Sequence, residues 1–382
     1  MNIAIVVIAF NRPESLKRLL SSISRAEYNN DNVTLVISID YQDSEPHAET
    51  LVVAKNFEWM HGEKKIIEHK NNLGLRKHVL SCGCLTETYP AIIMLEDDLF
   101  VSKQYYDYAQ QMLETYGNSN QISGISLYSH QWNVNVNRPF IPEPSEYDVY
   151  LIQFAQSWGQ CWNVRMWKEF YKWYQENENN IIEGENIPSF VKNWPKSSWL
   201  KYFISYTIKS NKYFVYPYYS LTTNFSDSGT HNKILDASFQ VVLQDNRMQY
   251  RIPLIDNAIK YDAFFEREDL SQSIGFIKSD LMIDLYGSKR KTNENYILTT
   301  KALPFKIIAS YGLCLRPHEL NIIHNIEGKD IFLYDTAGKV VLKNKRNNNI
   351  RILQYDYKNL NFRKLIYLLK DKLISKLYEN RI

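Results

Sequence analysis

The first hundred residues alternate between short apolar runs and longer segments whose apolar residues recur at helical spacing. The apolar runs, each about as long as a buried strand, lie at residues 3–10, 33–39, 66–69 and 91–95. In the first helical segment, which Pro13 opens, Leu16, Leu20 and Ile23 fall on one face. Strands that alternate with helices are typical of a parallel sheet covered by helices on both faces. The pattern therefore predicts an α/β fold.

Beyond residue 100 the pattern becomes irregular but still indicates separate elements. They are a helix over 101–116, a strand over 121–129, a turn at Ser157-Trp158-Gly159 before a Trp-rich helix, and a strand near 213–224. After about residue 233 the alternation fades, and we expect two strands on either side of 335–338 and a basic amphipathic helix near the C-terminus. This organisation predicts a first domain at 1–235 and a smaller α+β extension at 236–382.

Polar residues follow three of the four predicted strands. They are Asn11 and Arg12 after the first strand, Asp40 after the second, and Glu96, Asp97 and Asp98 after the fourth. The carboxyl ends of parallel strands share one edge of a sheet, where such folds bind ligands, so we expect these side chains to line one crevice. Three adjacent anions raise one another's pKa unless something positive lies among them, and a divalent cation is the obvious candidate. The chain has no G-x-G-x-x-G or G-K-[ST] loop, which argues against a hydride-transfer dinucleotide site and a P-loop.

The composition is that of a globular protein. The chain has 382 residues, of which 45% are apolar, so it can fill a substantial core. Its four cysteines show no zinc-ligand spacing, no stretch approaches the ~20 apolar residues of a membrane span, and the N-terminus lacks the features of a signal peptide. We therefore expect a cytoplasmic protein, and we expect no nucleic-acid partner.

Six stretches occur in an order that is found in a known family. They are "VVIAFNRPESLKRLLSSI", "ISID", "NNLGLRKHV", "IIMLEDDLFVSKQYYDYAQQML", "SWGQCW" and "NFSDSGTHN". Together they resemble bacterial nucleotide-sugar glycosyltransferases of the glycosyltransferase A fold, including glycosyltransferase family 2, and they are similar to N-acetylglucosaminyltransferase I. The resemblance spans roughly residues 1–235. It implies a Rossmann-like sheet and an inverting enzyme that transfers a hexosyl or N-acetylhexosaminyl group from a nucleotide sugar to a glycan, in the synthesis of a bacterial surface polysaccharide.

The resemblance implies a metal site in the acidic run. Asp98 would bind a manganese or magnesium ion directly, Glu96 and Asp97 would face the ribose and the donor sugar, and His231 would lie near the metal. A hard cation that bridges the diphosphate would stabilise the charge that develops on this leaving group. The alternative interpretations are a solvated acidic turn that caps the following helix and a surface histidine at position 231.

The resemblance also assigns residues to the nucleotide-sugar donor. Asp40 would accept a hydrogen bond from the base, with uracil favoured, and the alternative is an ordinary turn-forming residue. Arg12 and Arg76 would supply positive charge to the nucleotide or its phosphates, or else be solvated helix residues. The loop that cradles the donor sugar would be Ser157, Trp158 and Gly159, where glycine lets the backbone approach closely and tryptophan offers a flat apolar wall. A buried turn with a core tryptophan is the alternative.

An inverting transferase needs a general base that deprotonates the acceptor hydroxyl. In the resembling enzymes an Asp follows a Trp on the helix after the sugar loop, whereas here Trp199 is followed by Leu200 and Lys201. The candidate bases elsewhere are Asp227 and Glu169, with Glu183 and Glu185 as weaker choices.

Two other functions stay open from the sequence. A sugar nucleotidyltransferase would also use a parallel sheet and acidic metal ligands, but it normally needs a Gly-rich basic signature near its N-terminus, and the chain lacks those glycines. A non-catalytic nucleotide-sugar or carbohydrate binding protein of the same fold would agree with the missing carboxylate.

The C-terminal segment 360–382 raises a separate question about partners. Residues 341–382 hold eleven Lys and Arg against three Asp and Glu, although the net charge of the whole chain is only +3. The apolar residues of the predicted helix could lie on the anionic inner face of the cell membrane, which would suit a lipid-linked glycan acceptor. Alternatively, its leucines pack on the transferase domain and its lysines are simply solvated.

Overall fold

The computed structural model describes residues 2–29, 32–227, 239–290, 294–339 and 349–357, and in the C-terminal tail residues 363, 365–367, 369 and 370. It divides into two compact units. The first unit comprises residues 1–135 and 140–268, and the second comprises residues 136–139 and 269–382. The first unit thus continues past the boundary that we predicted at residue 235.

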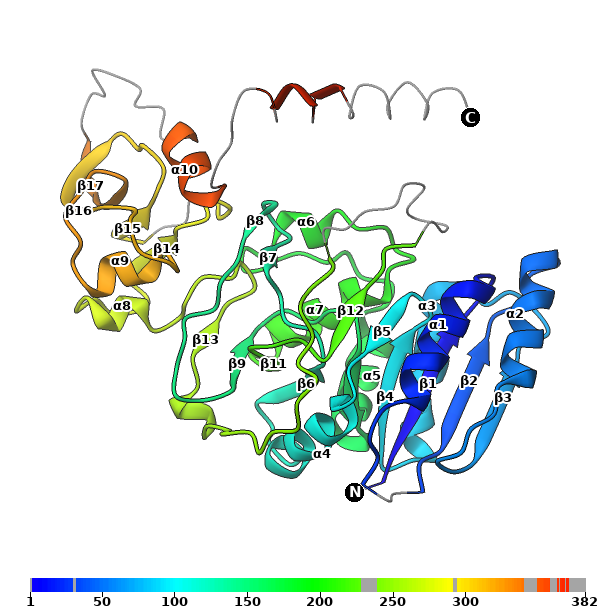
Figure 1. Cartoon of the computed structure of the whole chain (residues 1–382). Coiled ribbons are helices and arrows are strands. Elements are labelled where there is room, and N and C mark those ends of the chain that lie inside the picture. The colour runs from blue at the N-terminus through cyan, green and yellow to red at the C-terminus, as the bar shows by residue number, and fades with distance from the viewer. Residues whose placement is uncertain are drawn as a thin grey trace. The chain divides into compact units, whose positions relative to one another are not determined.

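A nine-stranded sheet forms the centre of the first unit (Figure 1). Its strands lie in the order β13 (Lys260–Tyr261), β9 (Val149–Ile152), β11 (Tyr213–Pro217), β6 (Ile122–Ser126), β10 (Gln160–Asn163), β4 (Ala91–Glu96), β1 (Ile3–Ala9), β2 (Leu35–Ile39) and β3 (Lys64–Glu68). The pairings give β3, β2, β1, β4, β6 and β11 one direction, while β10, β9 and β13 run the opposite way. The sheet is mostly parallel, which confirms the predicted α/β class.

Helices cover both faces of this sheet. They are α1 (Pro13–Ser24), α2 (Glu45–Asn56), α3 (Leu75–Gly83), the 3₁₀ helix η1 (Cys84–Glu87), α4 (Tyr105–Tyr116), α5 (Val164–Asn177), α6 (Ser189–Lys192) and α7 (Trp199–Lys209). In Figure 1 the blue helix α1 lies in front of the strands, whereas α3 and α5 lie behind them. In α1 the leucines and Ile23 that we predicted to share a face are buried, because helical spacing turns them all toward the sheet. The remaining elements of residues 1–268 are β5 (Leu99–Val101), β7 (Trp132–Asn133), β8 (Arg138–Pro139), β12 (Thr222–Asn224) and the 3₁₀ helix η2 (Ile255–Asn257).

One central strand was not expected. We predicted a helix after the turn at 157–159 and no strand between them, but β10 lies between the turn and α5. This strand pairs antiparallel with β4 on one side and with β6 on the other, and all four of its residues are buried. The turn that precedes β10 is therefore fixed next to the end of β4.

The second unit contains a smaller sheet. Its strands lie in the order β14 (Leu281–Asp284), β15 (Tyr296–Thr299), β17 (Ile331–Lys339) and β16 (Phe305–Tyr311), and its helices are α8 (Leu270–Ser273), α9 (Glu319–Ile323) and α10 (Asn349–Asp356). The prediction of two strands that meet at 335–338 was wrong, because β17 runs straight through these residues. Gly338 does not make a turn there but allows close approach, since a Cβ at this position would lie 2.7 Å from the Cβ of Lys306.

An ion pair fastens residues 136–139 to the rest of the second unit. The Arg138 Nε atom donates to Asp356 Oδ2 at 2.6 Å, and a second guanidinium nitrogen donates to Asp356 Oδ1 at 3.2 Å. The side chains are 12% and 3% exposed, so the pair is largely removed from water. A paired arrangement of this kind lets two opposite charges be buried together.

Most of the predicted C-terminal helix at 360–382 lies outside the described residues. Those that are described, residues 363, 365–367, 369 and 370, are helical and exposed. Within the described part of the chain, no helix combines the length and the apolar character that crossing a bilayer requires.

Candidate functional site

The acidic run lies at the carboxyl edge of the parallel strands, as predicted. Glu96 is the last residue of β4 and pairs in register with Ile8 of the neighbouring strand β1. Because β1 ends one residue later, Arg12 at the start of α1 is brought to the same edge. Its guanidinium donates to Asp98 Oδ2 at 3.1 Å and also to Asp97 Oδ1. One arginine therefore neutralises part of the charge of two adjacent carboxylates.

The carboxyl groups of this run are nevertheless hard to ionise. Burial raises the pKa of Asp97 to about 6, even though Arg12 and a backbone hydrogen bond with Phe10 act in the opposite direction. Burial, followed by repulsion from Asp98, raises the pKa of Glu96 to about 8, against the opposing effects of Arg12 and a hydrogen bond with Ser157. Arg12 alone thus leaves an excess of negative charge that a further cation would relieve.

The donor set is suited to a hard divalent cation held mainly by substrate and water. Asp97 is 2% exposed and its Oδ2 atom is buried without a hydrogen-bond partner, while the Asp98 side chain is 13% exposed. Among the residues that the structure describes, no three His, Cys, Asp or Glu side chains are arranged to hold a metal ion. Magnesium-type sites commonly use only one or two protein carboxylates. Asp98, the more accessible of the two aspartates, could serve as such a ligand.

A residue that the sequence analysis missed fixes the second oxygen of Asp98. The amide nitrogen of Asn224, at the end of β12, donates to Asp98 Oδ1 at 3.2 Å. Its amide oxygen accepts from the backbone N–H of Ser226 at 2.5 Å and from the Ser226 hydroxyl at 3.0 Å, so the orientation of the amide is determined. The backbone N–H of Phe225 donates to the carbonyl of Asp98 at 3.0 Å. β12 pairs with β5, which carries Asn224 to the acidic run.

The predicted sugar loop lies beside the acidic run. Ser157 is hydrogen-bonded to Glu96, and Trp158 and Ser157 are half-buried. Gly159 has φ = +93°, and a Cβ there would lie 2.8 Å from Cγ2 of Thr222, so both the backbone conformation and the space require glycine.

A buried glutamine holds this loop in place. The side-chain amide nitrogen of Gln156 donates to the Gly159 carbonyl at 2.8 Å and to the Ser126 hydroxyl at 2.7 Å, and its oxygen accepts from the backbone N–H of Trp158. The Trp158 ring contacts Phe239, with ring centroids 4.5 Å apart. The loop is thus a fixed turn that presents one half-buried indole ring.

Asp40 also lies at the carboxyl edge, but its carboxylate already has backbone donors. The N–H groups of Leu73 and Gly74 donate to its two oxygens at 2.8 and 3.0 Å, and the N–H of Tyr41 donates at 2.9 Å. Asp40 is 4% exposed. Its clearest structural role is to fasten the turn that precedes α3, and any hydrogen bond with a base would use the remaining acceptor capacity.

Arg76, at the start of α3, is not brought to the acidic run. Its guanidinium donates to the carbonyl of Lys196 at 2.8 Å and to the hydroxyl of Tyr202 at 3.2 Å. The guanidinium also lies over the rings of Tyr174 and Tyr202. These contacts tie Arg76 to the region around α7.

Of the two predicted bases, Asp227 lies with the carboxyl-edge residues. Its Oδ2 accepts from the hydroxyl of Ser15 at 2.7 Å and from the guanidinium of Arg18, both on α1. Burial alone would raise the pKa of Asp227, but the hydrogen bonds from Arg18 and Ser15 and the charges of Arg18 and Arg12 keep it below its usual value. Asp227 is therefore an ionised carboxylate at neutral pH.

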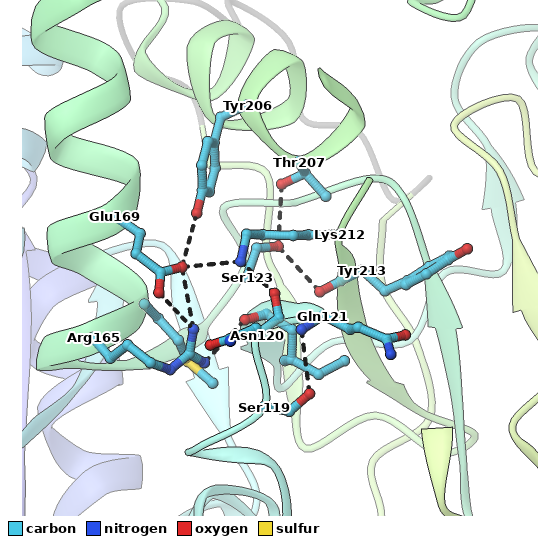
Figure 2. Close-up of polar contacts among 12 residues, drawn as sticks. Ser119, Asn120, Gln121, Ser123, Arg165, Glu169, Tyr206, Thr207, Lys212 and Tyr213 are labelled. Atoms are coloured by element: carbon cyan, nitrogen blue, oxygen red, sulfur yellow. Dashed lines mark hydrogen bonds and ion pairs between the residues drawn. The ribbon is translucent and has the colours of Figure 1, made fainter. Parts of the chain in front are cut away.

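Glu169 lies in a separate polar cluster with Arg165, Lys212 and Tyr206 (Figure 2). It accepts from Lys212 at 2.9 Å and from Arg165, one turn earlier on α5, at 3.2 Å. Lys212 immediately precedes β11, and Arg165 also donates to the carbonyl of Ile122, the first residue of β6. Since β6 and β11 run in the same direction as β4, this cluster lies at the amino ends of the parallel strands. The structure does not bring Glu169 together with the acidic run.

The remaining predicted residues do not add to the described site. His231 lies outside the described residues, and Glu183 and Glu185 are exposed in the loop before α6. Near the position where the resembling enzymes carry an Asp, at Leu200 and Lys201, the Lys201 ammonium donates to the carbonyls of Lys192 and Trp194 at 2.7 and 2.8 Å. This lysine ties α7 to the segment before it.

Comparisons with known proteins yield weak structural matches. No protein-family model matches the sequence, and no curated protein does. Residues 1–349 of S. aureus TarS match with 12% identity and a TM-score of 0.36, over 56% of this chain and 58% of that one. The complex of that protein with UDP-GlcNAc gives 10% and 0.38, over 60% of each chain. The mannosyltransferase PcManGT from Pyrobaculum calidifontis, in complex with GDP-Man and Mn2+, gives 11% and 0.32, over 43% of this chain and 45% of that one.

The sequence identities, coverages and TM-scores of these matches are all low. The chain spans less than two thirds of each matched structure, and every one of these TM-scores is below 0.4.

Proposed function

We propose that this chain is a glycosyltransferase that takes its sugar from a nucleotide-sugar donor and uses a divalent cation bound at Asp98. The observation that carries the proposal is the gathering of Arg12, the acidic run 96–98 and Ser157 at the carboxyl edge of a parallel sheet. Ligands of open α/β sheets bind at this edge. The same residues belong to the ordered motifs that resemble nucleotide-sugar glycosyltransferases.

Each residue of this set has a role that its chemistry suits. Mn2+ or Mg2+ bound at Asp98 would stabilise the negative charge of the departing nucleoside diphosphate. Asn224 holds the Asp98 carboxylate in one orientation. Glu96, which Ser157 contacts, would accept hydrogen bonds from hydroxyl groups of the donor, and the half-buried ring of Trp158 would pack against its sugar.

Asp227 is the carboxylate that we propose as general base. Both of its hydrogen-bond donors go to Oδ2, and no described residue donates to Oδ1. Oδ1 could therefore accept the proton of an acceptor hydroxyl. The acceptor would be a glycan or a lipid-linked glycan, in the synthesis of a bacterial surface polysaccharide.

The donor and the metal can be tested by thermal unfolding. We expect one nucleotide sugar, with UDP-sugars first in the panel, to raise the Tm in the presence of Mn2+ and much less in EDTA. Ligand at 100 times its Kd adds about 2.7 kcal/mol of stability. Asp98→Asn should lose the metal-dependent part of this shift, whereas Asp245→Asn, which changes an exposed carboxylate of the same unit, should keep it. An unchanged metal-dependent shift in Asp98→Asn would contradict the assignment of the ligand.

The base can be tested by turnover once a donor is known. Asp227→Asn should lower kcat by roughly 10²- to 10⁴-fold and leave donor affinity nearly unchanged, because a general base acts on the acceptor proton. Arg18→Gln is the matched control, since it breaks the same ion pair but keeps the carboxylate. If both variants lose activity equally, the ion pair matters and the base lies elsewhere. Donor binding without any transfer by the unmodified protein would favour a non-catalytic binding function.

A further inference from the structure

The guanidinium of Arg12 lies between the carboxylates of Asp97 and Asp98 and offsets part of their negative charge. It donates to Asp98 Oδ2 at 3.1 Å through one guanidinium nitrogen and to Asp97 Oδ1 through the other. Its side chain is 24% exposed, and the two aspartate side chains are 13% and 3% exposed. A guanidinium with parallel donors is well suited to hold two carboxylates at once.

Both oxygens of Asp98 are therefore occupied by protein donors. Oδ1 accepts from Asn224, whose amide cannot turn around without losing both hydrogen bonds from Ser226. Oδ2 accepts from Arg12. A divalent cation at Asp98 would have to use an oxygen beside one of these donors. The neutral amide of Asn224 is held in place, whereas the cationic guanidinium of Arg12 repels the metal and has a partly exposed side chain that can move.

We propose that Arg12 is an internal counter-cation that a divalent metal must displace from Asp98, and that the released guanidinium then binds the diphosphate of the donor. This inference rests on the proposed function. Metal alone binds weakly, because it competes with Arg12 for Asp98. Metal and nucleoside diphosphate together bind tightly, because the diphosphate offers Arg12 new oxygen acceptors. By linkage, each ligand strengthens the binding of the other by the same factor.

The coupling predicts opposite effects of one substitution on two affinities. In Arg12→Gln, Mn2+ alone should bind about tenfold more tightly than in the unmodified protein, since the competing cation is gone. The same variant should keep the coupling that comes from direct contact between metal and phosphate but lose the part that Arg12 supplies, so that UDP tightens Mn2+ binding by a smaller factor than in the unmodified protein. If Arg12 only contacted the phosphates, its removal would weaken UDP binding and leave the affinity for Mn2+ alone unchanged.

The experiment is a titration of the full chain with Mn2+, with and without UDP, followed by calorimetry or by the electron paramagnetic resonance signal of free Mn2+. Arg25→Gln, which removes the same charge at the other end of α1, is the matched control and should behave like the unmodified protein. Arg12→Lys serves as a second variant if Arg12→Gln does not fold, because an ammonium group lacks the fork that holds both carboxylates. It should bind Mn2+ alone about threefold more tightly than the unmodified protein.

The outcomes separate this inference from the proposed function. Equal or weaker binding of Mn2+ alone by the Arg12 variants, while UDP still binds with Mn2+ to the unmodified protein, overturns the inference and leaves the function standing. An unmodified protein that binds no Mn2+ with UDP or with any other nucleoside diphosphate of the donor panel overturns both.

Discussion

Glu96→Gln should stabilise the metal-free protein, and the gain should depend on pH. In the folded chain, burial and repulsion from Asp98 raise the pKa of Glu96 from 4.5 to about 8. The folded state therefore holds this proton more tightly than the unfolded state does. Stability contributed by protonated Glu96 is fully present below pH 4.5 and is lost as the pH rises toward 8. Glutamine keeps the shape and cannot ionise, so the variant escapes that loss.

The size of the effect follows from the shift. A single group whose pKa rises from 4.5 to about 8 on folding loses on the order of 4 kcal/mol of stability by pH 8. Asp97, whose pKa is raised from 3.8 to about 6, changes stability in the same direction and is present in both proteins. We expect Glu96→Gln to gain about 2–4 kcal/mol at pH 8 and under 1 kcal/mol at pH 5.

Urea unfolding followed by tryptophan fluorescence, at pH 5 and at pH 8 in EDTA, measures this difference. Glu58→Gln, which changes an exposed carboxylate of the same unit, is the control and should shift stability little at either pH. A Glu96→Gln protein that gains equally at both pH values, or that loses stability at pH 8, would refute the account of the buried acidic run. Excess Mn2+ should reduce the gain at pH 8, because a bound cation stabilises the ionised Glu96 of the unmodified protein.

Three further predictions concern residues whose contacts lie within a single unit. Gly159→Ala should cost about 2–4 kcal/mol and abolish donor-dependent thermal shifts, since it combines a left-handed backbone with a close contact; Gly275→Ala, at φ = +80° with open space, should show the smaller backbone cost alone. Asp356→Ala should destabilise the second unit by about 3–5 kcal/mol in urea unfolding, because it leaves Arg138 buried without its partner. Glu169→Gln should lower the melting temperature by a few degrees and leave kcat unchanged, and a large fall in kcat would restore it as a candidate base.

The regular strands and helices could be predicted from the sequence because their apolar residues recur in a regular pattern. β1, β2 and β4 are continuous apolar runs whose residues are buried on both faces, and α1 repeats its apolar residues at helical spacing. β10 was missed because its four residues mix polar and apolar side chains, and only pairing with β4 and β6 makes them a strand. Gly338 read as a turn because glycine is common in turns, but here it serves close packing in β17.

The charged residues of the site could be predicted from the sequence, but the residues that hydrogen-bond to them could not. The acidic run and Arg12 follow the ends of predicted strands, and in an α/β fold the carboxyl ends of parallel strands lie at one edge of the sheet. Asn224 had no local signal, since its importance comes from the pairing of β12 with β5. Asp227 and Glu169 look equivalent along the chain. They differ because Asp227 lies at the carboxyl ends of the parallel strands and Glu169 lies at the amino ends. This difference depends on the directions of strands that are far apart in sequence.

The ion pair between Arg138 and Asp356 has a consequence for how the chain is made. Arg138 leaves the ribosome 218 residues before its partner, which at typical rates of synthesis is a delay of about 10 to 40 seconds. During that time the strands of the first unit can fold, while the partner of Arg138 in the second unit has not yet been synthesised. In a protein truncated after residue 268, Asp356 would never be synthesised. Such a truncated protein would keep Arg138 but lack Asp356, so removal of the second unit leaves this arginine without its carboxylate partner.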